Sequence, residues 1–138
     1  MRTFMLFITL AALVGPGVAS ASCHGVDLGI TSVKVANVTS NGSVNHYTLV
    51  GTIANNGDQK QPSNALQFVD IYTNGQRVND RGIPPLGPGQ SYTFSYVWQR
   101  STDAGNNTTV MRFSLRMVPP SAGNADCNPN DKTTTIRF

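Results

Sequence analysis

The clearest structural signal in the sequence lies at residues 91–98, which read SYTFSYVW. Aromatic residues occupy every second position there, so their side chains project from one face of a β-strand. Residues 109–117 (TVMRFSLRM) alternate in the same way, with Arg112 and Arg116 on the face opposite the apolar residues. This period of two predicts strands that are buried on one side, as in antiparallel sheets.

Further strand signals lie at residues 26–35, 47–53, 66–73, 76–78 and 132–138. In the first segment the alternation changes phase between Ile30 and Val33, which predicts a β-bulge or a bend. Asn74-Gly75 is a strong hairpin signal, whereas the proline-rich residues 83–89 do not suit a central strand. About seven short strands in one chain predict an all-β fold, an immunoglobulin-like antiparallel sandwich of two sheets.

Length and charge narrow the class of protein. The chain has 138 residues, which suits one domain. Charged residues make up 12% of it, with 10 Lys+Arg against 7 Asp+Glu and a net charge of +3. Because nucleic-acid binding needs clustered basic residues, charge this sparse predicts no nucleic-acid partner. It also argues against a disordered charged tail.

The N-terminal segment has the three parts of a secretory signal peptide. Arg2 precedes an apolar run over residues 4–14, and the small residues Ala19-Ser20-Ala21 form a cleavage site. We expect a signal peptide over residues 1–21 and a single secreted or periplasmic domain over residues 22–138. The run is short for a membrane-spanning helix, so no transmembrane helix is expected in the mature chain. An uncleaved anchor and, because Cys23 follows the signal, a lipoprotein remain as alternatives.

Cys23 and Cys127 are the two cysteines of the chain. Export places them in an oxidising compartment, where an even number of cysteines favours pairing. We therefore expect a disulfide that joins the start of the domain to a loop near its end. In a sandwich with this strand order both residues would meet at one pole. Free thiols and pairing with a partner chain are the alternatives.

Several turn motifs occur in a recognisable order: DLGI at 27–30, NNGD at 55–58, IYTNGQ at 71–76, LGPGQS at 86–91 and NADCNPN at 124–130. Together they resemble the CARDB family, the cell-adhesion-related domain found in bacteria, over about residues 26–138. The resemblance implies an immunoglobulin-like module of an exported or cell-surface protein. The family has no shared catalytic residues, so the resemblance implies no active site.

The aromatic row within residues 91–98 has two interpretations. Tyr92, Phe94, Tyr96 and Trp98 form either a platform on which sugar rings stack or one wall of the hydrophobic core. Tyr92, Tyr96 and Trp98 are the candidate ligand-binding residues, and the two residues near the end of the strand are the best placed to be exposed. Exposure of these rings distinguishes the two interpretations.

Two weak metal motifs are present. Asp126, Asn128, Asn130 and Asp131 resemble the opening of an oxygen-rich calcium loop, although these residue types are also ordinary turn formers. Cleavage after residue 21 would place His24 third in the mature chain, where it suits copper or nickel, or it is incidental. We expect no resident metal or cofactor.

The remaining polar residues do not predict an enzyme. His24 and His46 are the only histidines, and neither lies in a nucleophile motif. Arg112 and Arg116 share a face that either binds an acidic polymer or is simply solvated. The sequence thus predicts a non-catalytic protein-interaction or adhesion-type module that binds an unidentified protein or surface glycan. A carbohydrate-binding module and a secreted metal-binding protein are the alternatives.

Overall fold

The computed structural model describes residues 23–105, 107–120 and 127–138, which form seven β-strands and two short 3-10 helices. The predicted signal peptide therefore lies outside the described residues. The strands are β1 (Leu28–Asn41), β2 (Val44–Asn55), β3 (Leu66–Thr73), β4 (Gln76–Ile83), β5 (Ser91–Ser101), β6 (Val110–Val118) and β7 (Thr133–Arg137). The 3-10 helices are η1 (Thr102–Ala104) and η2 (Pro129–Asp131).

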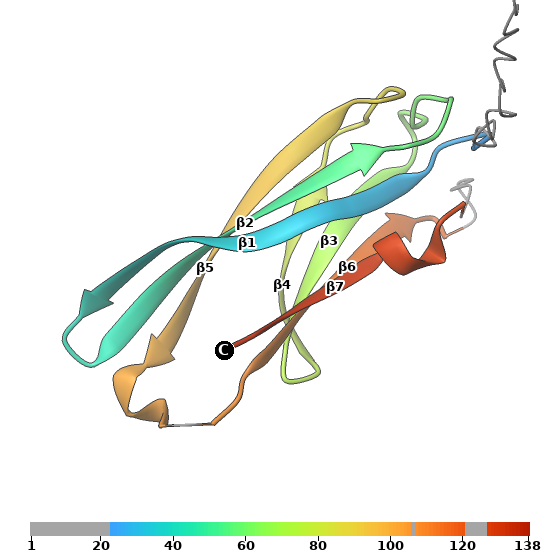
Figure 1. Ribbon diagram of the computed structural model, residues 1–138. Coiled ribbons are helices and arrows are strands. Elements are labelled where there is room, and N and C mark those ends of the chain that lie inside the picture. The colour runs from blue at the N-terminus through green and yellow to red at the C-terminus, as the bar shows by residue number, and fades with distance from the viewer. Residues whose placement is uncertain (1–22, 106, 121–126) are drawn as a thin grey trace, which may run out of the picture.

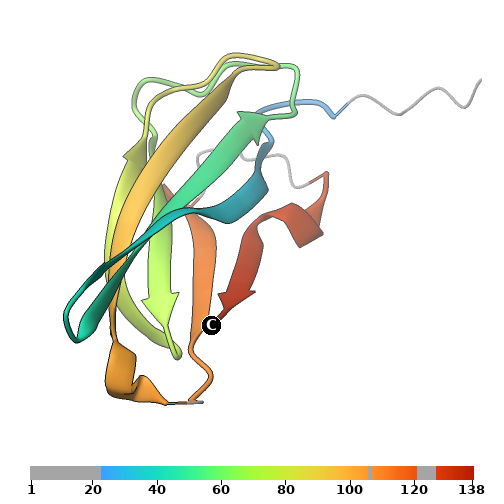
Figure 2. The ribbon, with the colours of Figure 1, turned by 60° about the vertical axis from the view of Figure 1, so that its left-hand side comes forward.

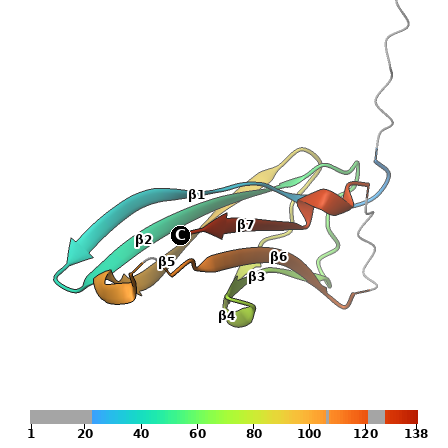
Figure 3. The ribbon, with the colours of Figure 1, turned by 60° about the horizontal axis from the view of Figure 1, so that its bottom comes forward.

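The strands form two antiparallel sheets, ordered β1-β2-β5 and β4-β3-β6-β7. The sheets stack face to face, as the two turned views show (Figures 2 and 3). Figure 1 shows the β1–β2 hairpin extending away from the N-terminal end of the sandwich. The predicted immunoglobulin-like sandwich is confirmed.

Local sequence signals explain several strand details. The register of β1 on β2 shifts between Ile30 and Ser32, where the alternation changes phase. A second shift between Val35 and Asn37 lets β1 run on to Asn41, beyond the segment that the sequence marks as a strand. Asn74 (φ 48°) and Gly75 (φ 84°) both adopt positive φ in the β3–β4 turn, as a type I′ hairpin requires.

The core lies between the sheets, because alternate residues of each strand point inward. Its most completely buried side chains come from both layers: Leu28, Leu49, Ile53, Val69, Ile71, Met111 and Phe113. Partly buried aromatic residues of β5 continue the core toward the far end of the sandwich. At Gly51 a Cβ atom would collide with the Phe94 ring, so glycine makes room for that ring.

One end of the sandwich, here called the disulfide pole, is closed by a Cys23–Cys127 disulfide with Cα atoms 5.9 Å apart. Asn55, which is fully buried, connects three chain segments there. Its Oδ1 accepts from the amides of Asp27 (3.1 Å) and Gly57 (3.0 Å). Its Nδ2 donates to the carbonyls of Gln59 (2.8 Å) and Leu86 (3.0 Å). The side chain is therefore satisfied in full, and it fixes the loops of this pole relative to one another.

Candidate functional site

The outer face of the four-stranded sheet carries a cluster of charged and aromatic side chains. In β3, alternate residues belong to the core, which turns Phe68, Asp70 and Tyr72 outward. The register places Arg116 opposite the first of these and Arg112 opposite the last. We call this surface the arginine face; its members are Phe68, Asp70, Tyr72, Arg77, Asp80, Arg112 and Arg116.

Asp70 is the centre of the arginine face and is only 4% exposed. Arg116 donates to both of its carboxylate oxygens, from Nε at 2.7 Å and from Nη2 at 3.0 Å. Arg77 Nη2 lies 3.0 Å from Asp70 Oδ1. Burial raises the pKa of the Asp70 carboxyl, but hydrogen bonding and attraction from Arg116, and then from Arg77, outweigh burial and leave this pKa below its usual value.

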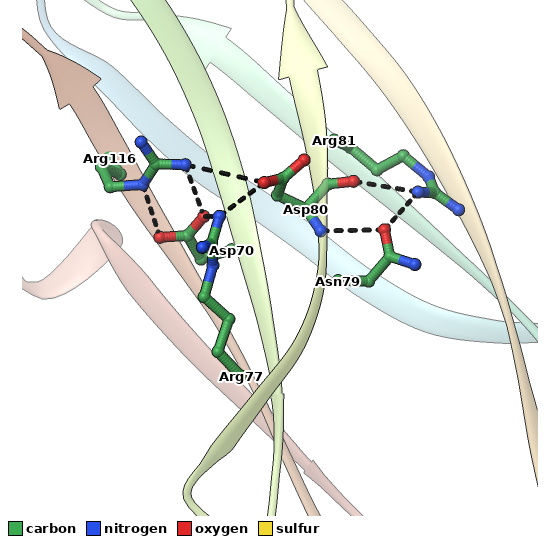
Figure 4. Close-up of polar contacts among 6 residues, drawn as sticks. All are labelled: Asp70, Arg77, Asn79, Asp80, Arg81 and Arg116. Carbon is green, nitrogen blue, oxygen red and sulfur yellow. Dashed lines mark hydrogen bonds and ion pairs between the residues drawn. The ribbon is translucent and has the colours of Figure 1, made fainter.

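Asp80, on the neighbouring strand β4, holds the two arginines from the other side (Figure 4). Its Oδ2 lies 2.5 Å from Arg77 Nη2 and 3.7 Å from Arg116 Nη2. The hydrogen bond to Asp70 raises the pKa of Arg116 further above its already high value. Two cations and two carboxylates thus form a network that fixes the guanidinium groups in place.

Both aromatic rings of the arginine face lie beneath a guanidinium group. Arg116 Cζ is 4.5 Å from the Phe68 ring centre, and Arg112 Cζ is 4.1 Å from the Tyr72 ring centre. Both distances are in the range of cation–π contacts. Within the described part of the chain no carboxylate pairs with Arg112, so this exposed guanidinium keeps its hydrogen-bond donors available on the surface.

The predicted aromatic row lies on the opposite sheet and faces inward. Tyr92, Tyr96 and Trp98 are half-buried and pack against the core cluster. The Trp98 ring centre is 5.3 Å from that of Tyr47 and 4.7 Å from that of Phe138. The rings of Trp98, Tyr47 and Phe138 therefore contact one another toward the end of the core opposite the disulfide pole.

The predicted calcium loop is only partly described, because Asp126 lies outside the described residues. Asn128 caps η2, where its Oδ1 accepts from the amide of Asn130 at 3.3 Å. Asp131 Oδ1 lies 3.1 Å from Lys132 Nζ. The two asparagines thus have the turn-forming geometry that the sequence left as one alternative.

Lys132 sits at the centre of a second ionic cluster, which we call the lysine clamp. Its Nζ donates to Asp27 Oδ1 at 2.6 Å and to the Leu28 carbonyl at 2.5 Å, and it also contacts Asp131. The Lys132 and Asp27 side chains are 19% and 3% exposed. Gly29 leaves room for the Asp131 carboxylate, which a Cβ atom would overlap.

His24 lies near the disulfide pole on the surface. Its Nδ1 is 2.9 Å from Asp58 Oδ2, and the amide of Gly25 donates to Asp58 Oδ1 at 2.6 Å. The hydrogen bond from the Gly25 amide makes the larger contribution to lowering the pKa of the Asp58 carboxyl, and the hydrogen bond with His24 lowers this pKa further. His24 thus pairs with an acid on the loop after β2.

Sequence reasoning found Arg112 and Arg116 but missed their aromatic and acidic partners. The available signal was the alternation within β3, which sets Phe68, Asp70 and Tyr72 on one face. The Asn-Gly hairpin then folds the next strand back beside it and brings its charged residues onto the same surface. The lysine clamp had no comparable signal, because Asp27 and Lys132 are 105 residues apart.

The CARDB family model matches residues 25–114, more than half of the chain. The chain therefore belongs to the CARDB family, as the resemblance implied, and CARDB is a family of non-enzymatic domains. No curated protein is similar enough in sequence to count as a relative.

Six solved chains match this chain in structure, among them the following two. One is the CARDB domain of the PF1109 protein from Pyrococcus furiosus, described as a complex with di-metal ions; it is 17% identical, with a TM-score of 0.59 over 83% of this chain and 93% of that one. The other is a domain of a "putative cell surface protein" from Methanosarcina acetivorans, 23% identical, with a TM-score of 0.57 over 82% of this chain and 90% of that one. Among the described residues of the present chain, none forms a helix long and apolar enough to cross a membrane.

Proposed function

We propose that this CARDB domain is an exported, non-catalytic interaction module that binds the acidic surface of a partner protein through its arginine face. The observation that carries the proposal is the exposed Arg112 guanidinium, whose Cζ lies over the Tyr72 ring at 4.1 Å from the ring centre and which has no carboxylate partner among the described residues. Arginine and aromatic residues are also the side chains enriched at protein interfaces.

The fixed geometry of the face supports recognition of carboxylates. Arg116 and Arg77 are held by Asp70 and Asp80 but keep 37% and 45% of their side chains exposed. Their orientation is therefore set before a partner binds, which reduces the entropy lost on association. Guanidinium groups also match the two oxygens of a carboxylate.

A protein partner fits this face better than a neutral sugar does. Sugars stack on bare ring faces, whereas the outward rings of Phe68 and Tyr72 each lie under a guanidinium group. The rings suggested by the sequence, Tyr92, Tyr96 and Trp98, pack against the core. We therefore expect a protein partner, and crosslinking to a glycan would contradict this expectation.

Metal binding is the second candidate, because the domain of PF1109 is described as a complex with di-metal ions. The donor groups described here do not fit such a site well. Cys23, Asp27 and Cys127 lie close together, but the two sulfur atoms are bonded to each other. The carboxylates of Asp27 and Asp131 already pair with the ammonium group of Lys132. Lys132 therefore balances the negative charge that a metal ion would otherwise balance.

Site-specific photo-crosslinking tests the proposed surface. Gly82 lies opposite Phe68 in the sheet, and a Cβ atom there meets open space, so a photoreactive side chain fits. We expect crosslinks to a surface protein from position 82 and none from exposed Ser32 on the other sheet. Arg112→Ser should abolish the crosslink, and Lys34→Ser should retain it.

The same experiment has outcomes that contradict the proposal. Equal crosslinking from positions 82 and 32, or a crosslink unaffected by Arg112→Ser, would assign recognition to another surface. Crosslinked material that carries glycan instead of protein would replace the protein partner with a sugar. N-terminal sequencing of exported material tests export separately, since cleavage after Ala21 predicts Ser22 as the first residue.

A further inference from the structure

Gln67 is a buried side chain whose hydrogen-bonding capacity is entirely unused. It lies on the inward side of β3 and is 3% exposed. Neither its Nε2 nor its Oε1 has a hydrogen-bond partner. Buried amide groups in native proteins are nearly always paired with protein or water, because losing both solvent and partners is costly.

Gln61 is an equally buried glutamine whose amide nitrogen, unlike that of Gln67, has a hydrogen-bond partner. It is also 3% exposed, but its Nε2 donates to the Ala65 carbonyl at 2.7 Å. Its amide thereby fixes the loop before β3. Gln67 makes no such contact, so the fold does not account for its amide group.

A cavity of about 230 Å³ adjoins Gln67 near the disulfide pole. Leu28, Phe68, Leu115 and Met117 supply apolar lining, and the cations Lys132 and Arg116 also border the cavity. An apolar cavity of about 150 Å³ in another protein is large enough to hold benzene. The present cavity therefore has room for a benzene-sized group together with a small polar head.

The charges around the cavity indicate which polar head fits. The ammonium group of Lys132 is already engaged by Asp27, Asp131 and the Leu28 carbonyl. Arg116, the second cation at the cavity, donates to both carboxylate oxygens of Asp70. Both cations are therefore already paired with carboxylates, so an anionic head gains little from them. Gln67 instead offers a neutral donor and a neutral acceptor side by side.

From this combination we infer that the cavity is a binding site for a small neutral molecule with an apolar body and an amide group. An amide of the ligand presents an N–H donor and a carbonyl acceptor, which pair with the Oε1 and Nε2 of Gln67. The apolar body fills the space between Leu28, Leu115 and Met117. The cavity shares Phe68 and Arg116 with the arginine face, but the inference rests on Gln67 and does not depend on the function proposed for that face.

Benzamide is a suitable probe, with toluene and benzoate as controls for shape and charge. The mature domain should bind benzamide about tenfold more tightly than toluene, because only benzamide can pair with the amide of Gln67. A tenfold difference corresponds to about 1.4 kcal/mol. Benzoate should bind more weakly than benzamide. In a ¹⁵N-labelled sample, benzamide should shift the side-chain amide signals of Gln67 and leave those of exposed Gln99 unchanged.

Gln67→Leu provides the matched variant, because leucine occupies similar space without an amide. We expect this variant to gain thermal stability and to lose the preference for benzamide over toluene. Gln61→Leu, which removes the hydrogen bond from Nε2 to the Ala65 carbonyl, should lose thermal stability and keep the preference.

The inference is overturned if wild-type protein binds none of the probes, if benzoate binds as tightly as benzamide, or if Gln67→Leu keeps the preference. The NMR shift of Gln67 decides the question in wild-type protein even if a variant fails to fold.

Discussion

The lysine clamp and the arginine face are ionic clusters of opposite design. In the clamp one cation, Lys132, is enclosed by Asp27 and Asp131, and its side chain is 19% exposed. In the face one buried carboxylate, Asp70, is enclosed by arginines whose side chains remain 37% and 45% exposed. One charge is surrounded by opposite charges in both clusters, but the surrounding groups are 3% and 16% exposed in the clamp and far more exposed in the face.

This difference separates a structural cluster from a surface suited to recognition. The clamp joins the start of β1 to the segment before β7, and its charges face one another. On the face, Asp70 fixes Arg116 from behind while the outer edges of the guanidinium group remain accessible. A partner can use charges of the second kind without first breaking the fold.

The largest expected effect on stability comes from removing the Cys23–Cys127 disulfide near the lysine clamp. Replacing both cysteines (Cys23→Ser with Cys127→Ser) should lower the free energy of unfolding by about 4–5 kcal/mol, because a loop of about 100 residues is no longer closed in the unfolded chain. Urea denaturation measures the change. A reducing agent should destabilise wild-type protein and leave the double variant unaffected; equal sensitivity of both would contradict the structural role of the bond.

Removing the cation of the clamp should have the next largest effect. Lys132→Met leaves the Asp27 carboxylate, whose side chain is 3% exposed, without its counter-ion. We expect a loss of about 3–4 kcal/mol in denaturant unfolding, as for other buried pairs that lose one partner. Adding Asp27→Asn should recover part of the loss. A Lys132→Met protein as stable as wild type would show that the clamp contributes little.

Removing the central carboxylate of the arginine face should lower the free energy of unfolding by less than removing Lys132, because the arginines of the face are partly exposed to solvent. Asp70→Asn is expected to lower stability at neutral pH by about 1–2 kcal/mol after allowance for screening. Since the folded pKa of Asp70 is lowered, its contribution is complete above the unfolded pKa of about 3.9. It disappears as the pH falls below that value and through the folded pKa.

Stability curves of wild-type protein and Asp70→Asn should therefore converge in acid. Asp103→Asn, which changes an exposed carboxylate in η1, is the matched control and should show no such convergence. A stability difference that stays constant down to the acid limit would mean that Asp70 does not act through its charge.

The smallest effect on stability is expected at Arg112. Arg112→Ser removes an exposed side chain and one ring contact, so unfolding should change by no more than about 0.5 kcal/mol. Binding of an acidic probe such as decaglutamate should nevertheless weaken several-fold relative to Lys34→Ser, measured by calorimetry at low salt. A loss of more than about 1 kcal/mol in stability would instead make Arg112 a structural residue.

The strand pattern was largely predictable, because the period of two depends only on neighbouring residues. The residues of β3 and the start of β5 were identified directly, and the bulge after Ile30 was visible as a change of phase. The length of β1 was not, because its end at Asn41 consists of exposed Thr, Ser and Asn residues without alternation. Pairing with β2 maintains those residues as a strand.

The candidate sites were less predictable than the strands. Arg112 and Arg116 were visible as a pair on one strand face, but their partners Phe68, Asp70 and Asp80 come from other strands. Asn55 looked like an ordinary turn residue, yet it is fully buried and makes four hydrogen bonds. An asparagine in a turn motif can be exposed to solvent or buried between loops, because local sequence does not specify which other loops pack against it.

The sequence by itself determined the class of fold, through alternation, turn residues and the spacing of strands. Only the tertiary structure decided which carboxylate meets which cation, and therefore that Asp27 closes a clamp on Lys132 while Asp70 orients Arg116. The physical reason is range: backbone geometry propagates over a few residues, whereas these contacts join residues 105 and 46 positions apart. The first contact joins the segments that lead into β1 and β7, which belong to different sheets, and the second joins the neighbouring strands β3 and β6 of one sheet.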